Sequence, residues 1–280
     1  MNATLLYACL QILSALQALP GPVGLAALES TASHKRRPDD AGRAFRVESP
    51  EGPVRIWLPP HYDPATAATV VYVHGYNRSA DVVWSVSALP RQFLASGRNA
   101  VFVVPTVAEN DRAPLRWGRL SALLSRVERA GVPLPGGPVV AVGHSGAYRT
   151  LSRWVDEPRL DAVVLLDALY GQEEAFARFA RHGRLVLVGH CTAARTERFL
   201  RRFAHVPRRD ELPGRSPFTA EERSAPVVYF GTHLGHAALN DDGAAIPSLL
   251  SLALPGHGPE ASPDARWLEG TLAQADWQAD

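Results

Sequence analysis

The chain has 280 residues, of which 46% are hydrophobic and 20% charged, which is the composition of a globular protein and excludes a disordered chain. Its net charge of +1 excludes a general attraction for nucleic acid or for an anionic membrane. Its two cysteines exclude a disulfide framework and a cysteine-rich zinc site.

Residues 1–33 are predicted to be an export signal or a membrane anchor. The stretch Ala3–Leu28 carries no charge, and Pro20 ends its unbroken apolar part before the length of about 20 residues that a spanning helix needs. Thr31-Ala32-Ser33 supplies small residues of the kind that a signal peptidase cleaves after. The basic residues Lys35–Arg37 follow directly and argue against export, because positive charge tends to stay on the cytoplasmic side. We expect a periplasmic or secreted protein if the segment is removed, and otherwise a cytoplasmic or anchored one that meets the membrane through this segment alone.

Residues 34–43 are predicted to be a polar linker, and residues 44–280 a single domain. Short runs of apolar, β-branched and aromatic residues predict a series of strands. In chain order these are Phe45–Glu48, Val54–Leu58, Thr69–Val73, Ala100–Val104, Val139–Val142, Ala162–Leu166, Leu185–Val188 and Pro226–Phe230.

Segments with apolar residues at helical spacing separate the later strands. They are Leu120–Val127, Tyr148–Val155, Gln172–Arg181 and Phe199–Phe203, with a last helix expected around Trp267–Trp277. The stretch Pro207–Ser224 has no periodic apolar face and is predicted to be a loop. Continuous apolar strands separated by helices predict an α/β fold, a mostly parallel central sheet with helices on both faces.

Ser145 is the candidate nucleophile. The run Val139–Ala147 is typical of a strand that enters a sharp turn and then a helix, and such turns lie at the carboxyl edge of a parallel sheet. Strand and helix approach closely there, so the small residues Gly143 and Ala147 fit the turn. A helix that begins at Gly146 directs its free N–H groups at the site, where they stabilise a developing oxyanion.

At this point the chain resembles the α/β-hydrolase superfamily, over about residues 44–258. The resemblance is carried by His74-Gly75-Tyr76-Asn77, by Gly143-His144-Ser145-Gly146-Ala147 and by Gly235-His236. It implies a nucleophile, an acid and a histidine in that chain order. The nucleophile motif departs from the stricter pattern, since alanine stands where the last glycine is usual.

The same resemblance implies an oxyanion hole formed by the backbone N–H groups of Tyr76 and Gly146. Asn77 and His144 lie beside these positions and are predicted to contact the substrate.

The acid is predicted to be Asp167, which follows a buried strand at the carboxyl edge of the sheet. A carboxylate there is costly to desolvate unless it has a partner. The resemblance favours the end of Leu185–Val188 for the acid, but no carboxylate stands there. Asp210 and Glu211 are the alternatives.

The base is predicted to be His236, because a Gly-His pair followed by apolar residues is the commoner ending in the superfamily. His233 is the alternative and lies nearer the end of its strand. Two histidines three residues apart on a loop are a weak zinc signal, so no metal is expected.

These residues predict a serine hydrolase that cleaves carboxylic esters through an acyl-enzyme, with no cofactor. Tyr170 leads directly into the next helical segment, which leaves no room for a cap domain. We therefore expect an open site for a small-molecule or exposed polymeric acyl substrate. A serine amidase or peptidase, an acyltransferase, and an inactive binding relative remain alternatives. Cys191 is expected to be a buried thiol near the site.

Overall fold

The computed structural model describes residues 42–106, 114–214 and 217–254. Contacts divide the chain into two units, Met1–Asp40 and Ala41–Asp280, and every described residue belongs to the second. The N-terminal segment and the helix expected around Trp267–Trp277 lie outside the described residues. Within the described ranges, no helix is both long enough and apolar enough to cross a membrane.

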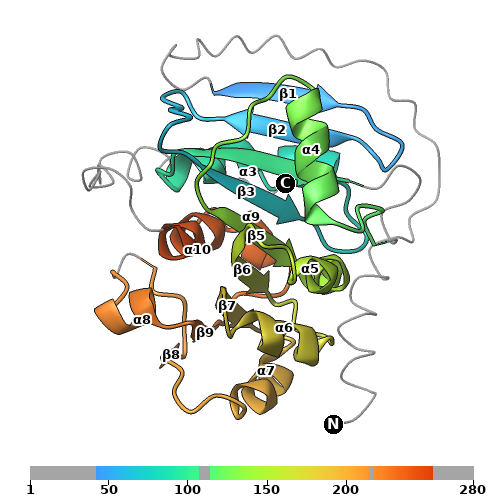
Figure 1. The fold of residues 1–280 in the computed structure, drawn as a ribbon. Coiled ribbons are helices and arrows are strands. Elements are labelled where there is room, and N and C mark those ends of the chain that lie inside the picture. The colour runs from blue at the N-terminus through green and yellow to red at the C-terminus, as the bar shows by residue number, and fades with distance from the viewer. Residues whose placement is uncertain (1–41, 107–113, 215–216, 255–280) are drawn as a thin grey trace, which may run out of the picture. The chain divides into compact units, whose positions relative to one another are not determined.

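One sheet forms the centre of the fold. Its strands are β1 (Arg43–Val47), β2 (Val54–Leu58), β3 (Ala68–Val73), β4 (Ala100–Pro105), β5 (Val139–His144), β6 (Leu160–Leu166), β7 (Arg184–Gly189), β8 (Arg208–Arg209) and β9 (Val227–Gly231). They lie in the order β1-β2-β4-β3-β5-β6-β7-β9-β8 (Figure 1). The pairs β1–β2 and β2–β4 are antiparallel and the other neighbours are parallel, so the predicted, mostly parallel sheet is confirmed.

Helices cover both faces of this sheet, as predicted. Those on one face are α4 (Leu120–Arg129), α5 (Tyr148–Trp154), α6 (Glu173–Phe179) and α7 (Ala193–Leu200). Those on the other are α2 (Ala80–Ser85), α3 (Leu89–Ala95), α9 (Ala238–Asp241) and α10 (Ala245–Ala253). Successive residues of a strand point to opposite faces of the sheet. In β5, Val139 and Ala141 therefore pack in the core under α4–α7, and Val140 and Val142 pack in the core on the opposite face. A strand buried on both sides is therefore apolar throughout.

The prediction of a loop over Pro207–Ser224 is wrong at two places. β8 pairs with β9, and α8 (Ala220–Ser224) begins at a capping box in which Thr219 and Glu222 satisfy each other's backbone N–H groups. The buried Glu222 carboxylate also accepts hydrogen bonds from Arg209 of β8. These elements are too short to show a periodic apolar face, although the spacing of Thr219 and Glu222 is itself a helix-start signal.

Four helices on the second face were not predicted either. α2, α3 and α9 have only one or two turns, too few for a recognisable period. α10 buries seven of its nine residues, so it lacks the polar face that marks an amphipathic helix.

The close approach of β5 and α5 explains the small residue at Gly143. A Cβ atom at that position would lie 2.8 Å from Leu151 Cδ2 and 2.9 Å from the Ala147 Cβ. Both contacts are closer than atoms tolerate in a packed core, so a side chain there forces strand and helix apart.

Replacing Gly143 is expected to destabilise the protein. We expect Gly143→Ala to lower the free energy of unfolding by about 1–3 kcal/mol through overpacking. Gly136→Ala is the matched control, because a Cβ at Gly136 meets no atom within 4 Å, and we expect it to change stability by less than about 0.5 kcal/mol. Urea unfolding measures both values, and equal values for the two variants would contradict the close approach.

Candidate active site

Ser145 lies on a strained turn at the carboxyl edge of the sheet. β5 ends at His144, and a 3-10 turn, η3 (Ser145–Ala147), leads into α5. The serine has a φ of 55°, which is unfavourable for a residue with a side chain and persists only where the surroundings impose it. The strained turn expected from the sequence is thus present, although the α-helix proper begins at Tyr148 rather than at Gly146.

Asp167 follows β6 on the neighbouring strand, and its side chain is completely buried. Its Oδ1 accepts hydrogen bonds from the His190 N–H, the Thr192 N–H and the Thr192 hydroxyl, at 2.8–2.9 Å. Its Oδ2 accepts from the Cys191 N–H at 3.1 Å. These donors from the loop after β7 offset much of the cost of burying the charge.

His236 provides the remaining partner of this carboxylate. Its Nδ1–H donates to Asp167 Oδ2 at 2.5 Å, and 20% of its side chain is exposed. Burial raises the pKa of Asp167, but the hydrogen bond and charge of His236 and the N–H groups of Thr192 and His190 outweigh it, so the pKa lies well below its usual range. Asp167 therefore stays ionised at neutral pH and fixes the orientation of the imidazole.

The histidine just before the nucleophile holds the loop that carries His236. The Nε2–H of His144 donates to the backbone carbonyl of His236 at 2.8 Å, and the two rings lie 4.5 Å apart between centroids. Burial, assisted by the nearby His236, lowers the pKa of His144 to about 3, so the ring stays neutral. This ring is buried, whereas a contact with substrate requires an exposed one. Its geometry therefore suits support of the loop better than the predicted substrate contact.

A second set of contacts anchors α9, which follows the same loop. The buried Asn240 accepts a hydrogen bond from the Tyr72 hydroxyl at 2.6 Å through its side chain. Its backbone carbonyl accepts another from Gln92 at 2.6 Å. Next to it, Asp241 pairs with Arg78 at 3.0 Å. These residues lie up to 168 positions apart in the chain, so the sequence pattern did not reveal the network.

The predicted oxyanion residues lie against the nucleophile turn. A Cβ at Gly75 would lie 2.8 Å from the Cβ of Ser145, and a Cβ at Gly146 would lie 2.7 Å from the ring of Tyr76. The loop after β3 therefore packs directly on the turn after β5, which requires glycine on both sides. Asn77 is exposed beside them with a φ of 62°.

The alternative base, His233, and the alternative acids, Asp210 and Glu211, lie at the surface. The His233 side chain is 74% exposed, and its Nδ1–H donates to Glu211 at 3.0 Å. Asp210 is also exposed. An ion pair this exposed contributes little to stability and orients its histidine weakly. The structure thus brings Asp167 and His236 together and leaves His233 with Glu211 at the surface.

Asp167, Cys191 and His236 also offer three metal-ligand atoms within 4.8 Å of one another. The two oxygens of Asp167, however, already accept five hydrogen bonds, while a carboxylate has about four lone-pair positions. Cys191 is half-buried and joins the carboxylate through its backbone N–H. The donor set fits a hydrogen-bonded carboxylate–imidazole pair and leaves no room on Asp167 for a cation.

No family model matches the sequence, and neither does any curated protein. Among solved structures, a mutant of the feruloyl esterase module from Clostridium thermocellum, complexed with sinapinate, aligns with 79% of this chain and 92% of its own at 13% identity and a TM-score of 0.56. A structure described as FAE aligns over the same shares at 12% identity and a TM-score of 0.53. Likeness at this identity establishes the architecture, and the chain has the α/β-hydrolase fold.

Proposed function

We propose that the protein is a serine hydrolase that cleaves carboxylic esters, with Ser145 as nucleophile, His236 as base and Asp167 as the acid that orients it. The observation that carries the proposal is the 2.5 Å hydrogen bond between His236 and a fully buried Asp167, beside the strained turn of Ser145. A buried carboxylate, an imidazole and a partly exposed serine together are the parts of a catalytic triad. The fold shared with a feruloyl esterase module is consistent with this activity.

In the first half of the proposed reaction, His236 accepts the hydroxyl proton of Ser145 as the serine oxygen attacks the acyl carbon of the ester. Asp167 stabilises the resulting imidazolium, and the backbone N–H groups of Tyr76 and Gly146 bind the oxyanion. The tetrahedral intermediate collapses, the C–O bond to the alcohol breaks, and His236 returns the proton to the departing alkoxide.

In the second half, a water molecule attacks the acyl-serine and gives up its proton to His236. The carboxylic acid leaves, and Ser145 regains its proton from the same imidazole. Every proton that is taken up is returned, so the cycle needs no cofactor.

The surroundings of the serine favour an open site. β6 passes to α6 through the short stretch 167–172, and the partly exposed rings of Tyr76, Tyr148 and Tyr170 surround the turn. Tyr170 lies edge-on to His236 at 6.1 Å between ring centroids. A partly exposed aromatic rim suits soluble or bulky esters.

Ser145→Ala tests the nucleophile. We expect the protein to hydrolyse p-nitrophenyl acetate and butyrate, and the variant to lose about 10³-fold or more of kcat/KM, because no other group attacks the ester. A fluorophosphonate should label the wild type and not the variant. If the wild type neither turns over these esters nor takes the label, the proposed function is wrong.

Parallel substitutions of the two histidines test the base. We expect His236→Ala to lower kcat by about 10³-fold or more, while His233→Ala stays within about threefold of wild type, because only His236 is held by a buried carboxylate. Both variants are assayed with p-nitrophenyl butyrate after circular dichroism confirms folding. A large loss in His233→Ala with activity retained in His236→Ala would reverse the assignment.

His144→Phe tests the residue that supports the loop. A neutral buried histidine costs stability in acid, because the unfolded chain binds a proton below pH 6.5 whereas the folded chain does so only near pH 3. The stability advantage of wild type over His144→Phe is therefore complete above pH 6.5. We expect it to shrink as the pH falls toward 4, by up to about 1.4 kcal/mol per pH unit.

Urea unfolding at several pH values measures this difference. We also expect kcat of His144→Phe to fall about 10-fold or more because the loop shifts, and His144→Gln, whose amide can still donate to the carbonyl, to retain more activity. A pH-independent difference in stability would show that His144 does not stay neutral in the folded protein.

A further inference from the structure

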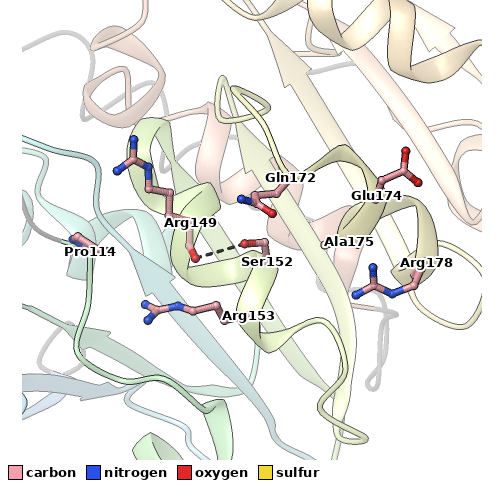
Figure 2. A pocket seen from close by; sticks show the side chains of 8 residues that line it. All are labelled: Pro114, Arg149, Ser152, Arg153, Gln172, Glu174, Ala175 and Arg178. Carbon is pink, nitrogen blue, oxygen red and sulfur yellow. Dashed lines mark hydrogen bonds between the residues drawn. The ribbon is translucent and has the colours of Figure 1, made fainter.

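A positively charged hollow of about 460 Å³ lies between α5 and α6 (Figure 2). Three guanidinium groups and one carboxylate line it, together with polar side chains. These lining residues are Arg149, Ser152, Arg153, Gln172, Glu174 and Arg178. We name this feature the arginine hollow, after Arg149, Arg153 and Arg178.

The acidic groups near the hollow do not neutralise it. Glu174 lies 2.6 Å from a fourth arginine, Arg202, and its side chain is 78% exposed, so it offsets little of the positive charge in the hollow. Arg178 lies 3.5 Å from Asp156, and both side chains are more than half exposed, which makes this pair weak in water.

The other two arginines have neutral partners in the part of the chain that the structure describes. Arg149 donates to a tyrosine hydroxyl at 3.2 Å, and Arg153 donates to the backbone carbonyl of Leu115 at 2.7 Å. Such contacts hold the side chains in place without cancelling their charge. The hollow therefore presents positioned cations to a ligand.

One contact and one short chain segment connect the hollow to the candidate active site. The guanidinium of Arg149 lies 5.4 Å from the ring centroid of Tyr76, whose ring packs on the residue after the nucleophile. On the other wall, Gln172 follows closely after Tyr170, whose ring packs edge-on against His236. Residues of the proposed triad and of the hollow thus share the same aromatic rim.

The spacing matches an extended small molecule. Ser152 lies seven residues after Ser145, which corresponds to roughly 10 Å of chain rise through the 3-10 turn and α5. A substrate with its acyl carbon at Ser145 would need a chain of several atoms to place an end group in the hollow.

We propose that the arginine hollow binds an anionic end group of the substrate, so that the preferred substrates are esters with a carboxylate or phosphate about 10 Å from the bond that is cleaved. Guanidinium groups bind the oxygens of either anion through paired N–H donors. Gln172 and Ser152 supply further polar contacts in the same hollow. This proposal rests on the proposed esterase function and extends it to the substrate class.

The test compares charged and uncharged esters of one length. The substrates are p-nitrophenyl hydrogen suberate, which ends in a carboxylate, and its uncharged methyl ester; a third ester ends in a phosphate. We expect wild type to favour the carboxylate or the phosphate over the methyl ester by about 10-fold or more in kcat/KM, as expected for hydrogen bonds to a charged group. The anion with the larger ratio identifies the end group.

Variants assign this preference to the hollow. We expect the double variant Arg149→Gln/Arg153→Gln to bring the ratio of kcat/KM for the anionic ester over the methyl ester close to 1. Arg153→Lys keeps the charge without the paired donors, so its ratio should lie between those of the double variant and wild type. Arg91→Gln is the matched control, because Arg91 is an exposed arginine on α3 at the other face of the sheet, and it should keep the wild-type ratio. Each ratio compares substrates on one protein, so a loss of folded enzyme cancels.

Two outcomes would overturn the proposal, and they are distinguishable. If wild type hydrolyses the methyl ester but shows no preference for charge, or if the double variant keeps the preference, the hollow is not the anion site and the proposed esterase stands. If wild type hydrolyses none of the esters and a fluorophosphonate does not label Ser145, the proposed function fails, and the substrate class fails with it.

Discussion

Asp167 is a carboxylate with no exposed surface, and the arrangement of the candidate site follows from the need to satisfy it. An ionised group buried without partners would destabilise the fold by several kcal/mol or would lose its charge. Here its donors come from the loop after β7 and from His236 after β9. Three segments that are distant in sequence therefore have to meet at one edge of the sheet, and parallel strands β6, β7 and β9, which are neighbours in the sheet, bring them there.

The same sheet places the proposed nucleophile next to the proposed acid. His144 of β5 is paired with Leu166 of β6, so the residues that follow, Ser145 and Asp167, leave the sheet side by side. Both have positive φ values, 55° and 44°, although neither is glycine. Strain at two adjacent strand ends is tolerated because the strands are buried on both faces and the following segments are tightly packed. Such strain concentrates at sites where the fold has to hold particular side chains in position.

The residues around Ser145 and Asp167 hold the segments of the candidate site in place. His144 holds the backbone of His236, and the Asn240 network fixes the helix that follows. On the solvent side the support is aromatic: the ring of Tyr76 lies between Gly146 and the guanidinium of Arg149. The Tyr76 ring therefore contacts both the turn of the proposed nucleophile and an arginine of the arginine hollow. Specificity for an anionic end group would therefore be built on α5, the helix that begins just after the nucleophile.

Much of this fold was readable from local pattern. Apolar strands alternating with amphipathic helices predicted the fold class and the helices of the first face, because a strand buried on both faces is a continuous apolar run and a helix buried on one face has a period of 3.6 residues. The turn at Ser145 and the carboxylate after β6 were also visible, since each depends on a few neighbouring residues. The edge strands β1 and β2 were predicted, but not their antiparallel pairing, and the short β8 and the largely buried α10 lacked such a period. Local pattern favoured His236 over His233 through its Gly-His pair, but it could not show which carboxylate each histidine meets, because both follow the same strand. That difference, like the contact of His144 with the histidine loop, arises when the chain folds and brings residues far apart in sequence within hydrogen-bond distance.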